Sequence, residues 1–84
     1  MEYIIRTTAL LILSEIYLQC DHSFKVSSLD CAKICTNTDK TDIQKAIKYL
    51  SEKRYIEPDG GIHIILSCNI TSSGIDWVED SQNN

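Results

Sequence analysis

Four cysteines and two histidines are the side chains of this 84-residue chain best suited to binding a transition metal or to redox chemistry. Four of these six lie close together in the sequence, namely Cys20, His22, Cys31 and Cys35. Thiolate and imidazole groups are the usual ligands of tetrahedral zinc. However, the spacing C-x-H-x8-C-x3-C matches no familiar zinc motif, and free cysteine is among the residue types most often buried. We therefore predict no metal and no cofactor, with zinc binding or redox sensing as the alternative.

A second kind of chemistry is indicated by the segment DKTDIQKAIKYLSEKR, from Asp39 to Arg54. It carries five basic and three acidic residues, a net charge of +2, whereas the whole chain has a net charge of −4. In a helix that buries its isoleucines, the outer face consists of Lys40, Thr41, Gln44, Lys45, Lys48 and Ser51. Lysine contacts phosphate groups or guanine, and glutamine can form two hydrogen bonds to adenine. The segment therefore predicts contact with double-stranded DNA, with Lys53 and Arg54 placed for the phosphate backbone.

Catalysis has little support in the sequence. The chain contains no pairing of a nucleophile with a base, no glycine-rich phosphate loop and no paired carboxylates suited to acid–base catalysis. A chain of this length also leaves little room for a substrate pocket. We predict that the protein is not an enzyme.

The length of the chain and the composition of its terminal segments limit how the protein can be organised. A chain of 84 residues forms one domain, so we predict a single domain over residues 1–80 and a flexible tail over residues 81–84. No secretory signal is recognisable, since Glu2 follows the first methionine, and the apolar run from Ala9 to Leu13 is too short to cross a membrane. We therefore expect a cytoplasmic protein with reduced thiols and no membrane association.

The first element that must position these side chains is a long helix over residues 2–20. This segment lacks glycine and proline and places apolar residues at helical spacing. Its inward face consists of Ile5, Ala9, Ile12, Leu13, Ile16 and Cys20. A second apolar stripe consists of Ile4, Leu11 and Leu18, spaced by seven residues, and is a candidate homodimer interface. Alternatively, a closing helix bearing Trp77 and Val78 covers this stripe within one chain, or joins it in the interface.

The middle of the chain predicts a strand and two further helices. An extended piece around Phe24 to Val26 precedes the helix LDCAKIC, which Ser27 or Ser28 can cap. The third helix begins at its capping residue Asp39, and its inward face consists of Ile43, Ala46, Ile47 and Leu50.

The last third of the sequence predicts a β-hairpin followed by the closing helix. Two β-prone runs surround the turn PDGG, which is typical of a β-hairpin. In the second run His63 faces solvent, and the opposite face consists of Ile62, Ile64, Leu66, Cys68 and Ile70. The run TSSGIDWVED predicts a short helix that carries Ile75, Trp77 and Val78. The predicted fold class is therefore α+β and mainly helical.

Three patterns along this order carry a family resemblance. Ala32 is central in the second helix, and the third helix has the pattern formed by Asp39, Ile43, Ile47 and Leu50. Near the C-terminus the chain has the pattern I-T-x-x-G-x-x-x-V-E, formed by Ile70, Thr71, Gly74, Val78 and Glu79. In these patterns the chain resembles small prokaryotic and phage winged helix-turn-helix domains. The resemblance implies three core helices, a short β-hairpin wing and a short C-terminal helix, with the third helix in the major groove.

Two positions depart from the pattern of that family. Arg54 stands where the family usually has a glycine that ends the third helix. The wing tip EPDGG carries two acids and no lysine or arginine, which disfavours contact between the wing and DNA.

The resemblance and the charge pattern together predict a winged-helix DNA-binding regulator of transcription that reads the major groove as a homodimer. The alternative is an acidic winged-helix module, phage- or plasmid-encoded, that binds a protein partner and not DNA. Fold alone does not decide between these functions, and an acidic surface can bind a basic protein or mimic nucleic acid.

Overall fold

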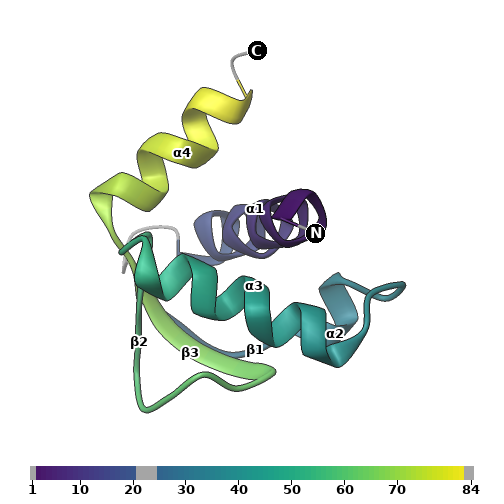
Figure 1. Cartoon of the computed structure of the whole chain (residues 1–84). Helices are drawn as coiled ribbons and strands as arrows, with labels where there is room; N and C mark the ends of the chain where they lie inside the picture. Colours follow the sequence, from purple (N-terminus) through teal and green to yellow (C-terminus); the bar gives the residue numbers. More distant parts are fainter. Residues whose placement is uncertain (1, 21–24, 83–84) are drawn as a thin grey trace.

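A computed structural model describes residues 2–20 and 25–82. These residues form four helices and three strands (Figure 1) in the order α1 (Glu2–Cys20), β1 (Lys25–Asp30), α2 (Cys31–Ile34), α3 (Lys40–Glu52), β2 (Ile56–Pro58), β3 (Ile65–Ile70) and α4 (Ser72–Gln82). The fold class is therefore α+β and mainly helical, as predicted. None of the helices in these residues combines the length and the apolar character that crossing a bilayer requires.

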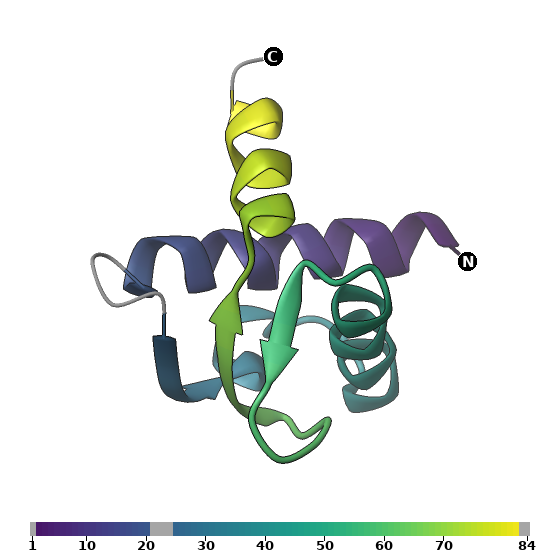
Figure 2. The same cartoon turned by 90° about the vertical axis from the view of Figure 1, so that its left-hand side faces the viewer.

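The three strands form one antiparallel sheet in the order β1-β3-β2. Strand β3 lies in the middle and pairs with β1 on one side and with β2 on the other. The register shifts between Val26 and Leu29 of β1, where Ser28 has a φ of 56°. Figure 2 shows the sheet and α3 on one side of α1, while α4 rises from the end of β3 past α1 on the other. Helix α1 therefore runs through the middle of the molecule.

The core lies between α1, α3 and the sheet. Helix α3 buries the four residues predicted to face inward, Ile43, Ala46, Ile47 and Leu50. Helix α1 buries its predicted inward face apart from Ile5, which is half-buried. A fully buried isoleucine or leucine contributes roughly 1.5–3 kcal/mol relative to its exposed state. This packing fixes which face of α3 is left for solvent.

The boundaries of β1 and α2 differ from the sequence prediction. Ser27 and Ser28 belong to β1, so neither of them caps α2. The cap is Asp30, whose Oδ1 accepts a hydrogen bond of 3.1 Å from the backbone N–H of Ala32. Helix α2 is a single turn because β1 stays paired with β3 as far as Asp30. Phe24 lies outside the described residues.

The hairpin and the last helix also differ from the prediction in their extents. Strand β3 begins at Ile65, so residues 62–64 belong to the connection from β2 and not to the strand. His63 is exposed as expected, but in this connection. Helix α4 continues to Gln82, so Ser81 and Gln82 belong to the helix and not to the tail predicted from residue 81. Residues 83 and 84 lie outside the described residues.

Thr71 joins the start of α4 to the end of α3. Its hydroxyl accepts a hydrogen bond of 3.1 Å from the Gly74 N–H, which caps the helix. The same hydroxyl donates to the carbonyl oxygen of Arg54 at 2.6 Å. The backbone N–H of Thr71 donates to the carbonyl oxygen of Tyr55 at 3.0 Å. One residue thus fixes the first turn of α4 against the segment that follows α3.

Arg54 ends α3 in a backbone conformation that glycine prefers. Its φ is 61°, and its N–H donates to Ser51 at 3.1 Å, while the N–H of Tyr55 donates to Leu50 at 2.9 Å. These two bonds form a Schellman motif, in which the residue after the cap is left-handed and usually glycine. Glycine is the residue that adopts this conformation without strain, so the arginine at this position is under backbone strain.

Replacing Arg54 with glycine is expected to raise the free energy of unfolding by about 0.5–1 kcal/mol. A non-glycine residue in the left-handed conformation is strained by about 1–2 kcal/mol, and Arg54→Gly removes this strain. Glycine also gives the unfolded chain more conformational entropy, which offsets part of that gain in stability. Urea unfolding followed by circular dichroism measures the difference. Lys53→Gly is the matched control, because Lys53 has a helical φ of −79° and should lose stability. Equal losses in both variants would contradict the strain at Arg54.

Candidate nucleic-acid interface

The outer face of α3 carries the side chains predicted to contact DNA. All seven predicted residues are exposed: Lys40, Thr41, Gln44, Lys45, Lys48, Lys53 and Arg54. Thr41, Lys45 and Lys48 lie three or four positions apart, so they form one stripe opposite the buried isoleucines. Lys53 and Arg54 follow the last turn of the helix. The structure therefore places the predicted residues on one helix and its immediate continuation.

Three lysines of the outer face of α3 are available for an anionic partner. Within residues 4–20 and 25–82, Lys40, Lys45 and Lys48 have no salt-bridge partner. Lys53 differs, since its Nζ lies 5.9 Å from the centre of the Tyr49 ring in a cation–π contact. An exposed lysine without a fixed partner can move to meet a phosphate group at little cost.

The connection between β2 and β3 has the opposite charge. Asp59 of this connection and the neighbouring Glu57 of β2 are both exposed. Lys25 of β1 approaches Asp59 with an Nζ–Oδ2 distance of 3.6 Å, but both side chains remain more than half exposed, so this ion pair contributes little. Sequence reasoning missed Lys25, because only the pairing of β1 with β3 brings it here. The acidic character read from the sequence is therefore present on the surface of this hairpin.

An aromatic cluster joins α1, α3 and α4. The Trp77 ring stacks on Tyr55 with centroids 4.8 Å apart, and the Tyr49 ring lies 6.3 Å away at a tilt. The guanidinium of Arg6 lies 5.8 Å from the centre of the Trp77 ring. The sequence did not indicate this cluster, because its members come from different elements and share no periodicity. Trp77 therefore has a structural role within one chain.

The structure separates the residues predicted for the dimer interface. Val78 is fully buried within the chain, so it has no surface to offer to a second copy and is withdrawn from the predicted interface. Ile4, Leu11 and Leu18 are 48%, 53% and 67% exposed, so α4 does not cover them. Helix α4 lies beside a different face of α1, where the Tyr17 hydroxyl donates to Glu79 at 2.7 Å. The intramolecular alternative for the stripe is therefore wrong.

The cysteines are buried thiols. Cys20, Cys31, Cys35 and Cys68 are all free and at most 4% exposed. Burial raises the pKa of Cys31 and the pKa of Cys68 to about 12, so both stay protonated and unreactive near neutral pH. Among the described residues, no three side chains of His, Cys, Asp or Glu gather to hold a metal, and His22 lies outside these residues. The thiols are packed as core residues, which is the interpretation favoured from the sequence.

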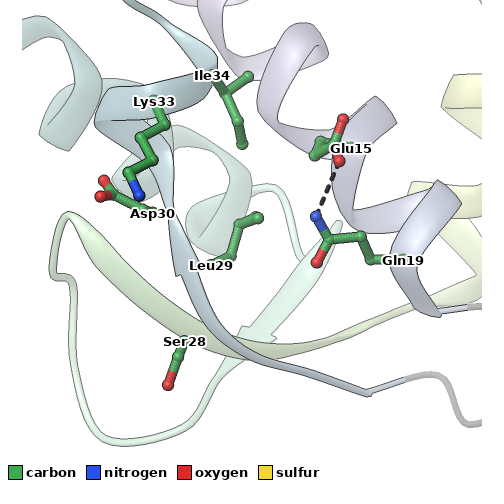
Figure 3. Close-up of a pocket in the computed structure, with 7 residues that line it drawn as sticks. All are labelled: Glu15, Gln19, Ser28, Leu29, Asp30, Lys33 and Ile34. Atoms are coloured by element: carbon green, nitrogen blue, oxygen red, sulfur yellow. Dashed lines mark hydrogen bonds between the residues drawn. The ribbon is translucent and has the colours of Figure 1, made fainter.

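One hollow on the surface lies between α1, β1 and α2 (Figure 3). It measures about 580 Å³ and is wide open to solvent. Glu15 and Gln19 form its α1 side and are already hydrogen-bonded to each other at 2.8 Å. Asp30 and Lys33 line the other side, and Ser28 projects away from the rest. The described residues contain no buried side-chain N or O atom without a hydrogen-bond partner.

The exposed face of α3 is thus the surface with the clearest chemical character. It combines three lysines that form no ion pair with the described part of the chain, a hydroxyl and an amide, on a helix that the core holds in place. Comparison with known proteins adds no relative: no family model, no curated protein and no solved structure matches this chain.

Proposed function

We propose that this protein is a winged-helix regulator of transcription that places α3 in the major groove of double-stranded DNA. The order of the elements supports this proposal, since α2 and α3 are followed by the antiparallel strands β2 and β3. In this reading α2 and α3 are the helix-turn-helix pair, and the hairpin of β2 and β3 is the wing. The observation that carries the proposal is that Lys45 and Lys48 are exposed on the outer face of α3 and form no salt bridge with the described residues.

Each side chain of this face has a distinct role in the proposed complex. The N-terminal half of a recognition helix meets base edges, so Thr41, Gln44 and Lys45 contact bases. Lys48, Lys53 and Arg54 contact phosphate groups. Three or four phosphate contacts give an observed affinity that falls with salt at a log–log slope of about −3 to −4. The acidic wing adds no attraction, so binding by one copy is weak.

The test is the salt dependence of binding to a random-sequence DNA duplex, for the parent and for Lys45→Gln/Lys48→Gln. On a duplex without a specific site, Lys45 has no matching base and both lysines are expected to contact phosphate groups, so the slope becomes shallower by about 2 and affinity near 50 mM salt falls more than about tenfold. The control is Ser73→Glu/Gln82→Glu, which changes the net charge by the same amount on exposed positions of α4. Equal losses in the two variants would mean that net charge, and not the α3 face, governs binding.

A second candidate function is favoured by the exposed acids of the hairpin, Glu57 and Asp59. An acidic hairpin and a net charge of −4 suit a basic protein partner better than DNA. This function predicts that the parent does not bind the duplex even near 50 mM salt. That result would overturn the DNA proposal and leave the protein-interaction module in its place.

A further inference from the structure

The outer stripe of α1, defined as Ile4, Leu11 and Leu18, has no partner among the residues that the structure describes. Among the large apolar residues that the structure describes, these three and Ile65 are the exposed ones. The inner face of α1 is the centre of the core, so this helix is apolar on two opposite faces. A helix with apolar residues on both faces is normally covered on both.

The spacing along the outer stripe is that of a helix–helix seam. Thr7 and Ser14 lie between its members, so positions 4, 7, 11, 14 and 18 alternate steps of three and four residues. This is the spacing of the a and d positions where one helix packs along another. The stripe therefore suits a straight helix of matching length rather than an irregular surface.

Charge identifies the partner. The chain has a net charge of −4, so two copies repel each other unless they meet through an uncharged surface. Residues 7–14 of α1 carry no charged side chain, so the centre of the outer stripe is uncharged, and Glu15 flanks it between Leu11 and Leu18. We propose that the outer stripe is the seam of a homodimer in which α1 packs antiparallel against α1 of a second copy.

The antiparallel orientation follows from the position of the charged residue beside the stripe and from the spacing of the stripe residues about Leu11. Glu15 lies beside Leu11 and Leu18 on the surface of α1, so parallel helices would set the Glu15 carboxylates of the two copies at the same level, whereas antiparallel helices keep them apart. Ile4 and Leu18 are each seven residues from Leu11. An antiparallel seam centred on Leu11 therefore sets Ile4 against Leu18 of the second copy.

The size of the seam sets its strength. A helix of 19 residues is about 28 Å long and about 10–12 Å wide, so its footprint is roughly 300 Å² per copy. Stable interfaces bury about 800 Å² per partner, so this dimer dissociates at micromolar concentrations or above. The dimer does not depend on the proposed function, since it holds whether or not α3 binds DNA.

Sedimentation velocity between about 1 μM and about 1 mM tests the proposal on the full chain. The parent is expected to shift from monomer to dimer across this range, and Leu11→Glu to remain monomeric, because each dimer would bury two facing carboxylates. Ile65→Glu is the matched control: it makes the same kind of change at an apolar residue that is 54% exposed on β3, and it should dimerise like the parent. A parent that stays monomeric, or two variants that behave alike, would overturn the proposal.

Cysteine cross-linking tests the orientation without placing a charge in the seam. The native thiols are buried, so a new surface cysteine is the reactive one. An equimolar mixture of Ile4→Cys and Leu18→Cys is expected to form the mixed disulfide-linked dimer with oxidised glutathione, whereas Ile4→Cys alone is not. Self-linking of Ile4→Cys above the level of the mixture would show a parallel seam and overturn the antiparallel one.

Discussion

Gly74→Ala is expected to lower the free energy of unfolding by about 2–4 kcal/mol, although alanine is the better helix former. A Cβ at this position would overlap the backbone carbonyl oxygen of Tyr55 and press on the side chain of Ile70. The carbonyl cannot turn away, because it accepts the hydrogen bond from Thr71. The higher helix propensity of alanine relative to glycine offsets only about 1 kcal/mol of this loss of stability. The first turn of α4 would therefore have to move away from Tyr55.

Thermal unfolding followed by circular dichroism measures this effect. A domain of this size loses about 4–8 °C of melting temperature per kcal/mol, so a decrease of about 10–25 °C is expected. Ser73→Ala is the control, because Ser73 is exposed on the neighbouring position of the same turn. It should stay within about 0.5 kcal/mol of the parent. If Gly74→Ala melted at or above the parent temperature, the close approach between α4 and Tyr55 would be wrong.

A rise in pH from 8 to 10 is expected to cost about 2–3 kcal/mol of stability through two buried thiols. Burial raises the pKa of Cys31 and the pKa of Cys68 from 9.0 to about 12. In the unfolded chain both thiols lose their protons near pH 9, while the folded chain still holds them. The unfolded state therefore binds fewer protons, and the free energy of unfolding falls as the pH rises between these pKa values.

Urea unfolding at a series of pH values, followed by the fluorescence of Trp77, measures this slope. Each thiol contributes about 1.4 kcal/mol per pH unit above pH 9. Cys68→Ala removes one of them, so its stability should depend less steeply on pH than that of the parent. The comparison uses slopes, because the lost sulfur also lowers stability at every pH. A parent whose stability is constant from pH 8 to pH 10 would contradict burial of the protonated thiols.

The helices could be predicted from the sequence because their apolar spacing reports directly on burial. Residues 2–20 and the inward residues of α3 are examples, since each pattern needs only its own segment. The boundaries of α2 and β3 could not be predicted in this way. Asp30 caps α2 because β1 stays paired as far as that residue, and this pairing depends on residues 65–69, far along the chain. Pairing between segments that are far apart in the chain produces no periodic pattern in the local sequence of either segment.

The same distinction between local pattern and long-range packing applies to the candidate site. The exposed face of α3 follows from helical geometry once Ile43 and Ile47 are known to face inward. The burial of Val78 and the stacking of Trp77 on Tyr55 depend instead on where α4 docks. A short amphipathic segment indicates that it packs, but not against which neighbour. For this reason the sequence assigned Val78 to a surface between copies when it belongs to the core.

Helix α4 gives the molecule two levels of local stability. Of its residues, Gly74 and Val78 are the buried ones, and its last turns extend beyond the body of the domain (Figure 1). Opening those turns exposes little apolar surface, so their amide hydrogens exchange with solvent through local fraying. The amides of α1 and α3 exchange only when the core opens. Protease cleavage at the C-terminal end therefore proceeds without global unfolding, and a chain trimmed there keeps its folded body.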